Sequence, residues 1–180
     1  AHAAAYEYSD MEEIFKNLYK QKMNIALIGM PASGKTSVGK LLSEKLQKTF
    51  VDSDDEIVKA ENKKITEIFE EFGEAYFRNI EKSVIKELSM LNSQVISTGG
   101  GAILNSENIE NLKANSRIYF LDRPLDMLIT TQDRPLSSNR ADLEKRYNER
   151  YELYKNYCDY RVENIGSLEE VVNKIAKLRE

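Results

Sequence analysis

The chain has 180 residues, of which 41% are hydrophobic, so it is long enough to bury one core and we expect a single compact domain. Its formal net charge is only −4 and it carries one cysteine and one histidine, which argues against general nucleic-acid binding, anionic-membrane binding and Cys/His metal sites. No apolar run approaches the roughly 18–20 residues of a membrane span, and the N-terminus lacks a signal-peptide core, so we expect a soluble, cytoplasmic protein.

The first 22 residues differ from the rest of the chain, and we assign them no chemistry. Residues 1–10 show no core pattern. The run MEEIFKNLYKQK that follows has apolar residues at helical spacing, namely Ile14, Phe15, Leu18 and Tyr19. This pattern predicts a short amphipathic helix packed on the surface. We therefore expect an N-terminal extension, a tail or surface helix, over residues 1–22 and one domain over residues 23–180.

In the rest of the chain, apolar runs of β type alternate with helical segments. The expected strands cover residues 24–29, 49–54, 94–100, 117–122 and 159–164. The most regular helical pattern covers residues 74–91, and the last helix opens at Ser167 with a capping box to Glu170. This alternation predicts an α/β fold with a parallel sheet covered on both faces. Ligands are expected in the crevice at the carboxyl ends of its strands.

The segment GMPASGKT, Gly29 to Thr36, matches the phosphate-binding pattern G-x-x-x-x-G-K-[ST] and lies between an expected strand and an expected helix. Its glycines let successive amides converge on phosphate oxygens, and the helix beginning near Gly34 adds the positive end of its dipole. Lys35 supplies charge to the β- and γ-phosphates, and Thr36 offers a hydroxyl to Mg²⁺. The motif predicts a nucleoside triphosphate with Mg²⁺. It leaves the acceptor open: water, a protein, a small hydroxyl compound, or none in a binding module.

An acidic run, DSDDE, follows the second expected strand. We expect Asp52 and Asp54 to alternate along an extended segment and so to point to separate faces. One carboxylate is then placed to support Mg²⁺ and the other to reach an acceptor hydroxyl. The run also fits a helix N-terminus, where negative charge is favourable.

The helical segment FGEAYFRNIE carries Arg78 beside an aromatic residue. Glu74 lies four residues before Arg78 and Glu81 three residues after it, so either is placed to hold its guanidinium group. A lone arginine on a helix is also common as a solvated charge. The segment alone therefore does not decide between these two roles.

Three further features lie later in the chain. STGGGA leads from an expected strand into Gly99, Gly100 and Gly101, which allow a ligand close to the backbone, although a tight turn would use the same residues. DRPLS places Arg134 in a polar stretch typical of a mobile loop. NERYELY places Arg150 on the following helix.

Together these segments resemble the shikimate kinase family. GMPASGKT, DSDDE, GEAYFR, TGGGA, DRPLS and the pattern E-R-x-x-x-Y occur in that family's order and near its spacings, from about Asn24 to about Arg179. The resemblance implies a three-layer P-loop kinase of the nucleoside-monophosphate-kinase type, with a five-stranded parallel sheet and a mobile lid. It implies ATP-dependent phosphorylation of the 3-hydroxyl of shikimate in chorismate biosynthesis, with Mg²⁺ as cofactor. It also implies a monomer without a nucleic-acid or membrane partner.

The same resemblance implies a role for each segment. ATP would be bound by residues of the phosphate loop and the lid: Gly29, Ala32, Ser33, Gly34, Lys35, Thr36, Ser37 and Arg134. The metal would be held by Thr36 and Asp52. Shikimate would be bound by Asp54, Arg78, Gly99, Gly100, Gly101 and Arg150, with the two arginines clamping its carboxylate. Catalysis would fall to Asp54 as the candidate base, Lys35 and Arg134, and the adenine-contact region aligns with residues 164–167.

Two alternatives remain open from the sequence. Another small-molecule kinase on the same scaffold, such as a gluconate kinase, would also need a carboxylate-binding arginine. The joint presence of Asp54, Arg78, the three glycines and Arg150 favours shikimate. A nucleotide-binding regulatory module without turnover is the alternative from another class. It is disfavoured because the expected catalytic set has no gap: Lys35, Thr36, Asp52, Asp54 and Arg134.

Overall fold

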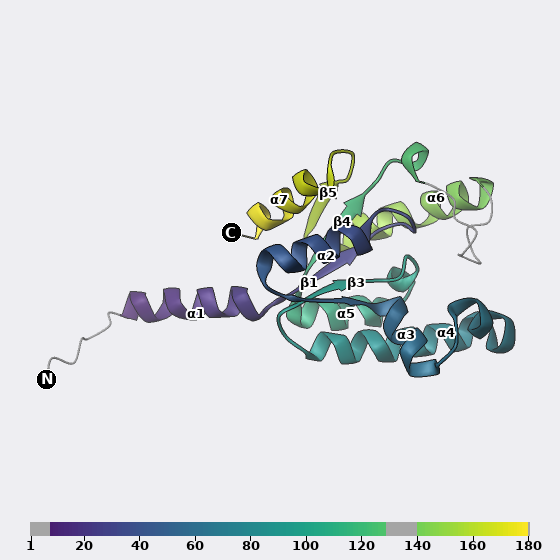
Figure 1. Ribbon diagram of the computed structural model, residues 1–180, viewed down its shortest axis with the longest axis horizontal. Helices are drawn as coiled ribbons and strands as arrows, with labels where there is room; N and C mark the ends of the chain where they lie inside the picture. Colours follow the sequence, from purple (N-terminus) through teal and green to yellow (C-terminus); the bar gives the residue numbers. More distant parts are fainter. Residues whose placement is uncertain (1–7, 129–139, 180) are drawn as a thin grey trace, which may run out of the picture.

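The computed structural model describes residues 8–128 and 140–179, in which a five-stranded sheet has helices on both faces (Figure 1). All five expected strands are present: β1 (Asn24–Ile28), β2 (Thr49–Asp52), β3 (Gln94–Ser97), β4 (Ser116–Asp122) and β5 (Tyr160–Glu163). They pair in parallel in the order β2-β3-β1-β4-β5. The chain places β2 and β3 on one side of β1 and β4 and β5 on the other. This reversal opens a crevice at the carboxyl ends of the central strands.

The helices form the two outer layers and confirm the predicted three-layer α/β architecture. They are α2 (Lys35–Leu46), α3 (Ser53–Glu61), α4 (Ile65–Met90), α5 (Ser106–Asn115), α6 (Arg140–Tyr157) and α7 (Leu168–Leu178), with the short 3-10 helices η1 (Ala102–Leu104) and η2 (Leu125–Met127). The predicted capping box opens α7, where Ser167 Oγ accepts from the amide of Glu170 at 3.3 Å. None of the helices in the described parts of the chain is long and apolar enough to span a bilayer.

Alternate residues of β1 face two separate hydrophobic cores. Ala26 and Ile28 belong to the core shared with α4, α5 and α6, whereas Ile25 and Leu27 belong to the core shared with α2 and α7. All four side chains are at most 2% exposed. This is the behaviour of a central parallel strand, whose successive side chains point to opposite, equally buried faces.

Helix α4 contains the segment predicted to be helical at residues 74–91, but it also contains a kink. Gly73 has φ 80° and ψ 174°, a conformation that separates the stretch before it from the stretch that carries Arg78. Non-glycine residues rarely adopt this region. The kink therefore sets the direction of the helical segment that brings Arg78 to the crevice.

The predicted N-terminal helix is present as α1 (Tyr8–Lys22), but it extends away from the amino ends of the strands and does not lie along the domain surface (Figure 1). Its apolar side chains are largely exposed: Met11, Ile14, Phe15, Leu18 and Tyr19. The structure thus differs from the surface packing that the helical spacing suggested. The spacing places these apolar side chains on one face of the helix. No neighbouring element in the described chain covers that face. The domain boundary at residue 22 stays a prediction.

The C-terminal end of α1 is attached to the domain through its last carbonyl groups. Lys48 Nζ donates to the carbonyl oxygens of Gln21 and Met23, at 2.5 and 2.9 Å. The amide of Ser93 donates to the carbonyl oxygen of Lys22 at 2.7 Å. A helix leaves its last carbonyl groups unsatisfied and partly negative, so an ammonium group and an amide from the domain stabilise this end.

Candidate active site

The phosphate loop joins β1 to α2 and requires glycine at two positions. Gly29 has φ +149°, and a Cβ atom there would lie 2.7 Å from the carbonyl oxygen of Leu121. Gly34 has φ +88° and is the N-cap of α2. The loop therefore passes closely over β4 and ends at the N-terminus of a helix, as predicted, with the unpaired amides of α2 directed to the crevice.

Lys35 lies at the base of this loop. Its side chain is buried, and Nζ donates to the carbonyl oxygens of Gly29 and Met30 at 2.8 and 2.9 Å. These bonds keep a positive charge inside the curve of the loop. The arrangement concentrates donors and positive charge where phosphate oxygens would be bound.

Thr36 and Asp52 meet across the crevice. Thr36 Oγ1 donates to Asp52 Oδ2 at 2.9 Å, and Asp52 Oδ1 accepts from the amide of Asp54 at 3.1 Å. The second bond makes Asp52 the N-cap of α3, which begins at Ser53. The expectation that Asp52 and Asp54 alternate along an extended segment is therefore wrong. The capping bond turns the chain into a helix at once, so Asp54 stands in the first turn of α3.

A cavity of about 210 Å³ lies between the loop and the ends of β2 and β3. It is lined by residues predicted to bind ATP or the metal, namely Ala32, Gly34, Lys35, Thr36, Ser37 and Asp52, together with Asp54, predicted to bind the acceptor, and with Ser97 and Thr98. Among the described residues, Gly29 and Ser33 shape the loop without lining this cavity. Sequence reasoning missed Ser97 and Thr98, although both belong to the segment that precedes the three glycines.

Arg78 is held by both of the carboxylates proposed for it. Its Nη1 donates to Glu81 Oε2 at 2.8 Å, and its Nη2 donates to Glu74 Oε1 at 3.0 Å. Glu81 is buried, and burial raises the pKa of its carboxyl group while Arg78 opposes that shift. Asp54 and Arg150 also act electrostatically on Glu81. Glu81 therefore forms one charged cluster with Arg78, Asp54 and Arg150, on the acceptor side of the crevice.

The three glycines let this cluster approach the backbone. A Cβ atom on Gly99 would lie 2.7 Å from Asp54 Oδ1, and one on Gly101 would lie 2.5 Å from Arg78 Nη2. On Gly100 it would lie 2.6 Å from Cδ of Pro31 in the phosphate loop. Larger residues would push the charged groups and the loop apart. The turn that the sequence offered as one alternative is present, with the amide of Ala102 donating to the carbonyl oxygen of Gly99 at 3.1 Å, whereas the approach of a ligand to this backbone stays a prediction.

Arg150, on α6, reaches the same place from the other side. It is 7% exposed, and its Nη1 donates to the carbonyl oxygen of Gly100 at 3.3 Å. Its Nε is buried and has no hydrogen-bond partner in the described part of the chain. A buried guanidinium group with donors to spare is suited to bind an anion.

Two residues support the site through contacts that the sequence did not predict, Tyr154 and Asn164, although Asn164 lies in the region that the resemblance aligned with adenine contacts. Tyr154 lies one turn after Arg150, and its hydroxyl donates to the carbonyl oxygen of Gly100 at 2.5 Å. Asn164, at the end of β5, donates through Nδ2 to the carbonyl oxygen of Ser33 at 2.6 Å. The spacing within E-R-x-x-x-Y could have indicated Tyr154, whereas the contact of Asn164 depends on how β5 packs beside the loop. Arg134 lies outside the described residues.

Comparisons with known proteins give one consistent result. A family model described as shikimate kinase matches residues 31–179. A shikimate kinase from Clostridium botulinum (strain Alaska E43 / Type E3) is 40% identical over 161 residues, which cover 87% of this chain and 97% of the relative. One from Persephonella marina is 42% identical over 158 residues, covering 84% and 96%.

Solved structures agree with these sequence relatives. A shikimate kinase from Acinetobacter baumannii in complex with shikimate superimposes with a TM-score of 0.85 at 34% identity, covering 90% of this chain and 95% of that one. The Aquifex aeolicus enzyme superimposes with a TM-score of 0.77 at 39% identity, covering 86% and 95%. The similarity therefore extends over nearly the whole of each relative.

Proposed function

This chain belongs to the shikimate kinase family, and we propose that it transfers the γ-phosphoryl group of ATP to the 3-hydroxyl of shikimate. The products are shikimate 3-phosphate and ADP, in chorismate biosynthesis. One observation carries the proposal: the phosphate loop and the charged cluster that contains Arg78 and Arg150 meet at Asp54. Its carboxylate lines the cavity beside the loop and lies against Gly99.

On the donor side, the phosphate loop binds ATP. Amides of the loop and of the first turn of α2 surround the phosphates, and the ammonium group of Lys35 interacts with the β- and γ-phosphates. The bonds from Lys35 to Gly29 and Met30 support this role because they already hold its charge inside the loop. Arg134 is proposed as a second cation that reaches the transferring phosphoryl group when the site closes.

On the acceptor side, Arg78 and Arg150 bind the carboxylate of shikimate. A planar guanidinium group matches a carboxylate in geometry, which favours arginine over lysine here. Glu74 and Glu81 support the proposal because they fix the guanidinium of Arg78 in one orientation. The backbone from Gly99 to Gly101 then borders the ring of shikimate.

Asp54 stands between the two sides and contacts the hydroxyl that is phosphorylated. Its carboxylate accepts the proton of that hydroxyl or orients it toward the γ-phosphate. Phosphoryl transfer depends mostly on positioning and charge neutralisation, so a fixed carboxylate next to the phosphate loop suits either role.

Mg²⁺ fits the oxygen atoms of Thr36 and Asp52. The hydroxyl and the carboxylate lie 2.9 Å apart, and both are hard oxygen donors of the kind that Mg²⁺ prefers. No group of three or more His, Cys, Asp or Glu side chains suited to a metal occurs in the described ranges. That agrees with a metal shared between protein, phosphates and water. When bound, Mg²⁺ neutralises charge on the phosphates.

The acceptor can be tested by measuring ADP release. The protein is assayed with Mg²⁺ and ATP alone and then with shikimate, gluconate or quinate added separately. We expect a large increase with shikimate only. An increase with gluconate instead would favour a gluconate kinase, and no increase in protein that binds ATP would favour a nucleotide-binding module.

Two properties of the enzyme remain part of the proposal. We place it in the cytoplasm, and we expect it to act as a monomer on its two small substrates without nucleic acid or membrane. Sedimentation of the purified chain with both substrates checks the monomer, and a stable dimer would contradict it.

A further inference from the structure

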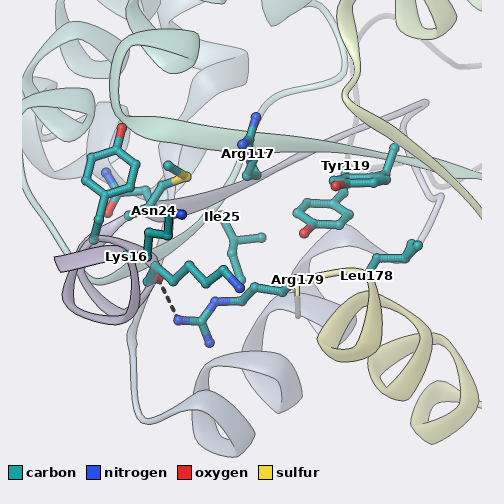
Figure 2. Close-up of a pocket in the computed structure, with 11 residues that line it drawn as sticks. Lys16, Asn24, Ile25, Arg117, Tyr119, Leu178 and Arg179 are labelled. Atoms are coloured by element: carbon teal, nitrogen blue, oxygen red, sulfur yellow. Dashed lines mark hydrogen bonds between the residues drawn. The ribbon is translucent and has the colours of Figure 1, made fainter. Parts of the chain in front are cut away.

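A second cavity lies at the amino ends of the strands, opposite the end that carries the phosphate loop. It has a volume of about 270 Å³ and is enclosed by α1, the first residues of β1, β4 and β5, and the end of α7. Figure 2 shows Lys16 and Arg179 entering this space from α1 and α7, and the ring of Tyr119 bordering it. The cavity is as large as the cleft beside the phosphate loop, which measures about 210 Å³.

The charged side chains that line this cavity are all cationic, and one of them, Lys16, also pairs with Glu12 outside the lining at 3.7 Å. Four cationic side chains line it, namely Lys16, Lys20, Arg117 and Arg179. No acidic side chain lines it in the part of the chain that the structure describes. Arg179 uses Nη2 to donate to the carbonyl oxygen of Lys20 at 2.6 Å, and a guanidinium group has further donors. Arg117 and Arg179 both act electrostatically on Tyr119, so an anion bound beside that residue would be attracted by both guanidinium groups.

A buried hydroxyl group gives an independent sign of a ligand. Tyr119 is 0% exposed, and its Oη has no hydrogen-bond partner among the described residues. Its ring stacks on that of Tyr160 at 5.2 Å between centroids, which holds it in place. Burial raises the pKa of Tyr119 to about 12, so the hydroxyl remains a proton donor at neutral pH. A buried hydroxyl without an acceptor is unfavourable, and the oxygen of an anion would satisfy it.

We propose that this cavity is a second binding site, separate from the kinase cleft, for a small organic anion. Its carboxylate or phosphate head binds Arg117, Arg179 and the hydroxyl of Tyr119. Its body is flat and apolar, because Tyr19, Ile25 and Leu178 complete the wall. A ligand that carries an ammonium group is disfavoured, since it would face the guanidinium groups of Arg117 and Arg179.

The extension is part of this site. Lys16, Tyr19 and Lys20 belong to α1, whereas the family match begins at residue 31. The bonds from Lys48, Ser93 and Arg179 to the last carbonyl groups of α1 keep that wall in position. The site therefore depends on a helix that lies outside the matched kinase region.

Calorimetric titration of the full chain tests the proposal, with benzoate, phenyl phosphate, inorganic phosphate, benzylammonium and phenylalanine as probes. We expect saturable binding of benzoate or phenyl phosphate, with Kd on the order of 1 mM or lower. Whichever of the two binds tighter identifies the head group. If inorganic phosphate bound as tightly as phenyl phosphate, the ligand would not need an apolar body. If benzylammonium or phenylalanine bound more tightly than benzoate, the site would not be specific for anions.

Four variants locate the binding. Arg117→Gln and Tyr119→Phe should each weaken it about tenfold or more, because each removes a hydrogen bond to the anion. Lys177→Gln removes one positive charge, as Arg117→Gln does, but at an exposed position of α7 outside the cavity. It should leave the affinity for the probe unchanged. Arg78→Ala should also leave it unchanged, which excludes binding of the probe in the kinase cleft.

A measurement without ligand checks the buried hydroxyl directly. Tyr119→Phe should raise the thermal midpoint of the free protein, since it removes an unsatisfied polar group from the interior. The proposal is overturned if no anionic probe binds saturably, if all variants bind equally, or if Tyr119→Phe lowers the midpoint. None of these results bears on shikimate phosphorylation, which the ADP assay tests separately.

Discussion

Arg78 owes its position to two carboxylates on its own helix, Glu74 and Glu81, and its guanidinium packs over Gly101. Arg78→Ala should raise KM for shikimate about 10- to 100-fold, because a hydrogen bond to a charged group contributes about 1.5–3 kcal/mol. KM for ATP should change little, since Arg78 does not line the cavity beside the phosphate loop. Steady-state kinetics with each substrate varied in turn measures both constants.

A matched variant on the same helix controls for general damage to α4. Lys82 is half-buried and pairs with Glu107 of α5. Lys82→Ala should leave both constants near those of the parent protein. An equal increase of both constants in Arg78→Ala would contradict the carboxylate clamp.

Asp54 is predicted to act in turnover and not in folding. Asp54→Asn keeps the size of the side chain and leaves Asp52 as the N-cap of α3. We expect the variant to bind ATP normally but to lose at least about 100-fold in kcat, within the range for a group that moves or orients a proton. Calorimetric titration with ATP and the rate of ADP release with shikimate give the two readouts.

Asp55 provides the comparison for this variant. It is the next residue of α3, is exposed and does not line the cavity. Asp55→Asn should retain almost full turnover. If Asp54→Asn retained it as well, Asp54 would have no part in the chemistry.

At the scale of an element, α4 depends on Gly73. Its φ of 80° and ψ of 174° belong to a region that other residues enter at a cost of about 1–3 kcal/mol. A Cβ atom there would meet nothing within 4 Å, so Gly73→Ala tests the backbone conformation alone. We expect the free energy of unfolding to fall by about 1–3 kcal/mol in urea titrations. KM for shikimate should rise because the segment with Arg78 shifts.

An alanine at a regular helical position of α4 gives the baseline. Glu87 is exposed and lies well after the kink. Glu87→Ala should change the free energy of unfolding by no more than about 0.5 kcal/mol. If Gly73→Ala lowered the free energy of unfolding by no more than this, the backbone conformation at the kink would not require glycine.

At the scale of the whole molecule, the attachment of α1 should depend on pH through Lys48. Burial, and next the charge of Arg179, lower the pKa of Lys48 from 10.5 to about 8 in the folded protein. Between these two values the unfolded chain binds more protons at this residue than the folded chain does. The contribution of Lys48 to the free energy of unfolding therefore rises as pH rises through this window. A neutral amine still donates to the carbonyl groups of Gln21 and Met23.

Urea unfolding at both ends of this window measures the effect. The free energy of unfolding of the parent protein should exceed that of Lys48→Gln by an amount that grows as pH rises. Lys45→Gln removes a lysine at an exposed position of α2 and is the control, for which the difference in the free energy of unfolding should stay constant across the window. A difference for Lys48→Gln that shrinks with pH would contradict the lowered pKa.

Much of the fold follows from local patterns in the chain. The run NIALI has the length and composition of a buried parallel strand, and Ser167 with Glu170 marks the start of α7. The phosphate loop is equally local, because its function depends on amides and a lysine within eight residues. Helical spacing placed Glu74 and Glu81 within reach of Arg78, and both pair with it, but spacing alone did not decide between a held arginine and a solvated one.

Contacts between residues far apart in the chain were decided by packing. Asp52 binds Thr36 and caps α3, so Asp54 lies in a helix and not in an extended strand. Asn164 reaches the carbonyl oxygen of Ser33 only because the sheet places the end of β5 beside the phosphate loop. The direction of α1 and the cavity at its base depend on three attachments from elsewhere in the domain. Spacing along a chain indicates which residues share a face, but which faces meet depends on strand order and on the fit of side chains.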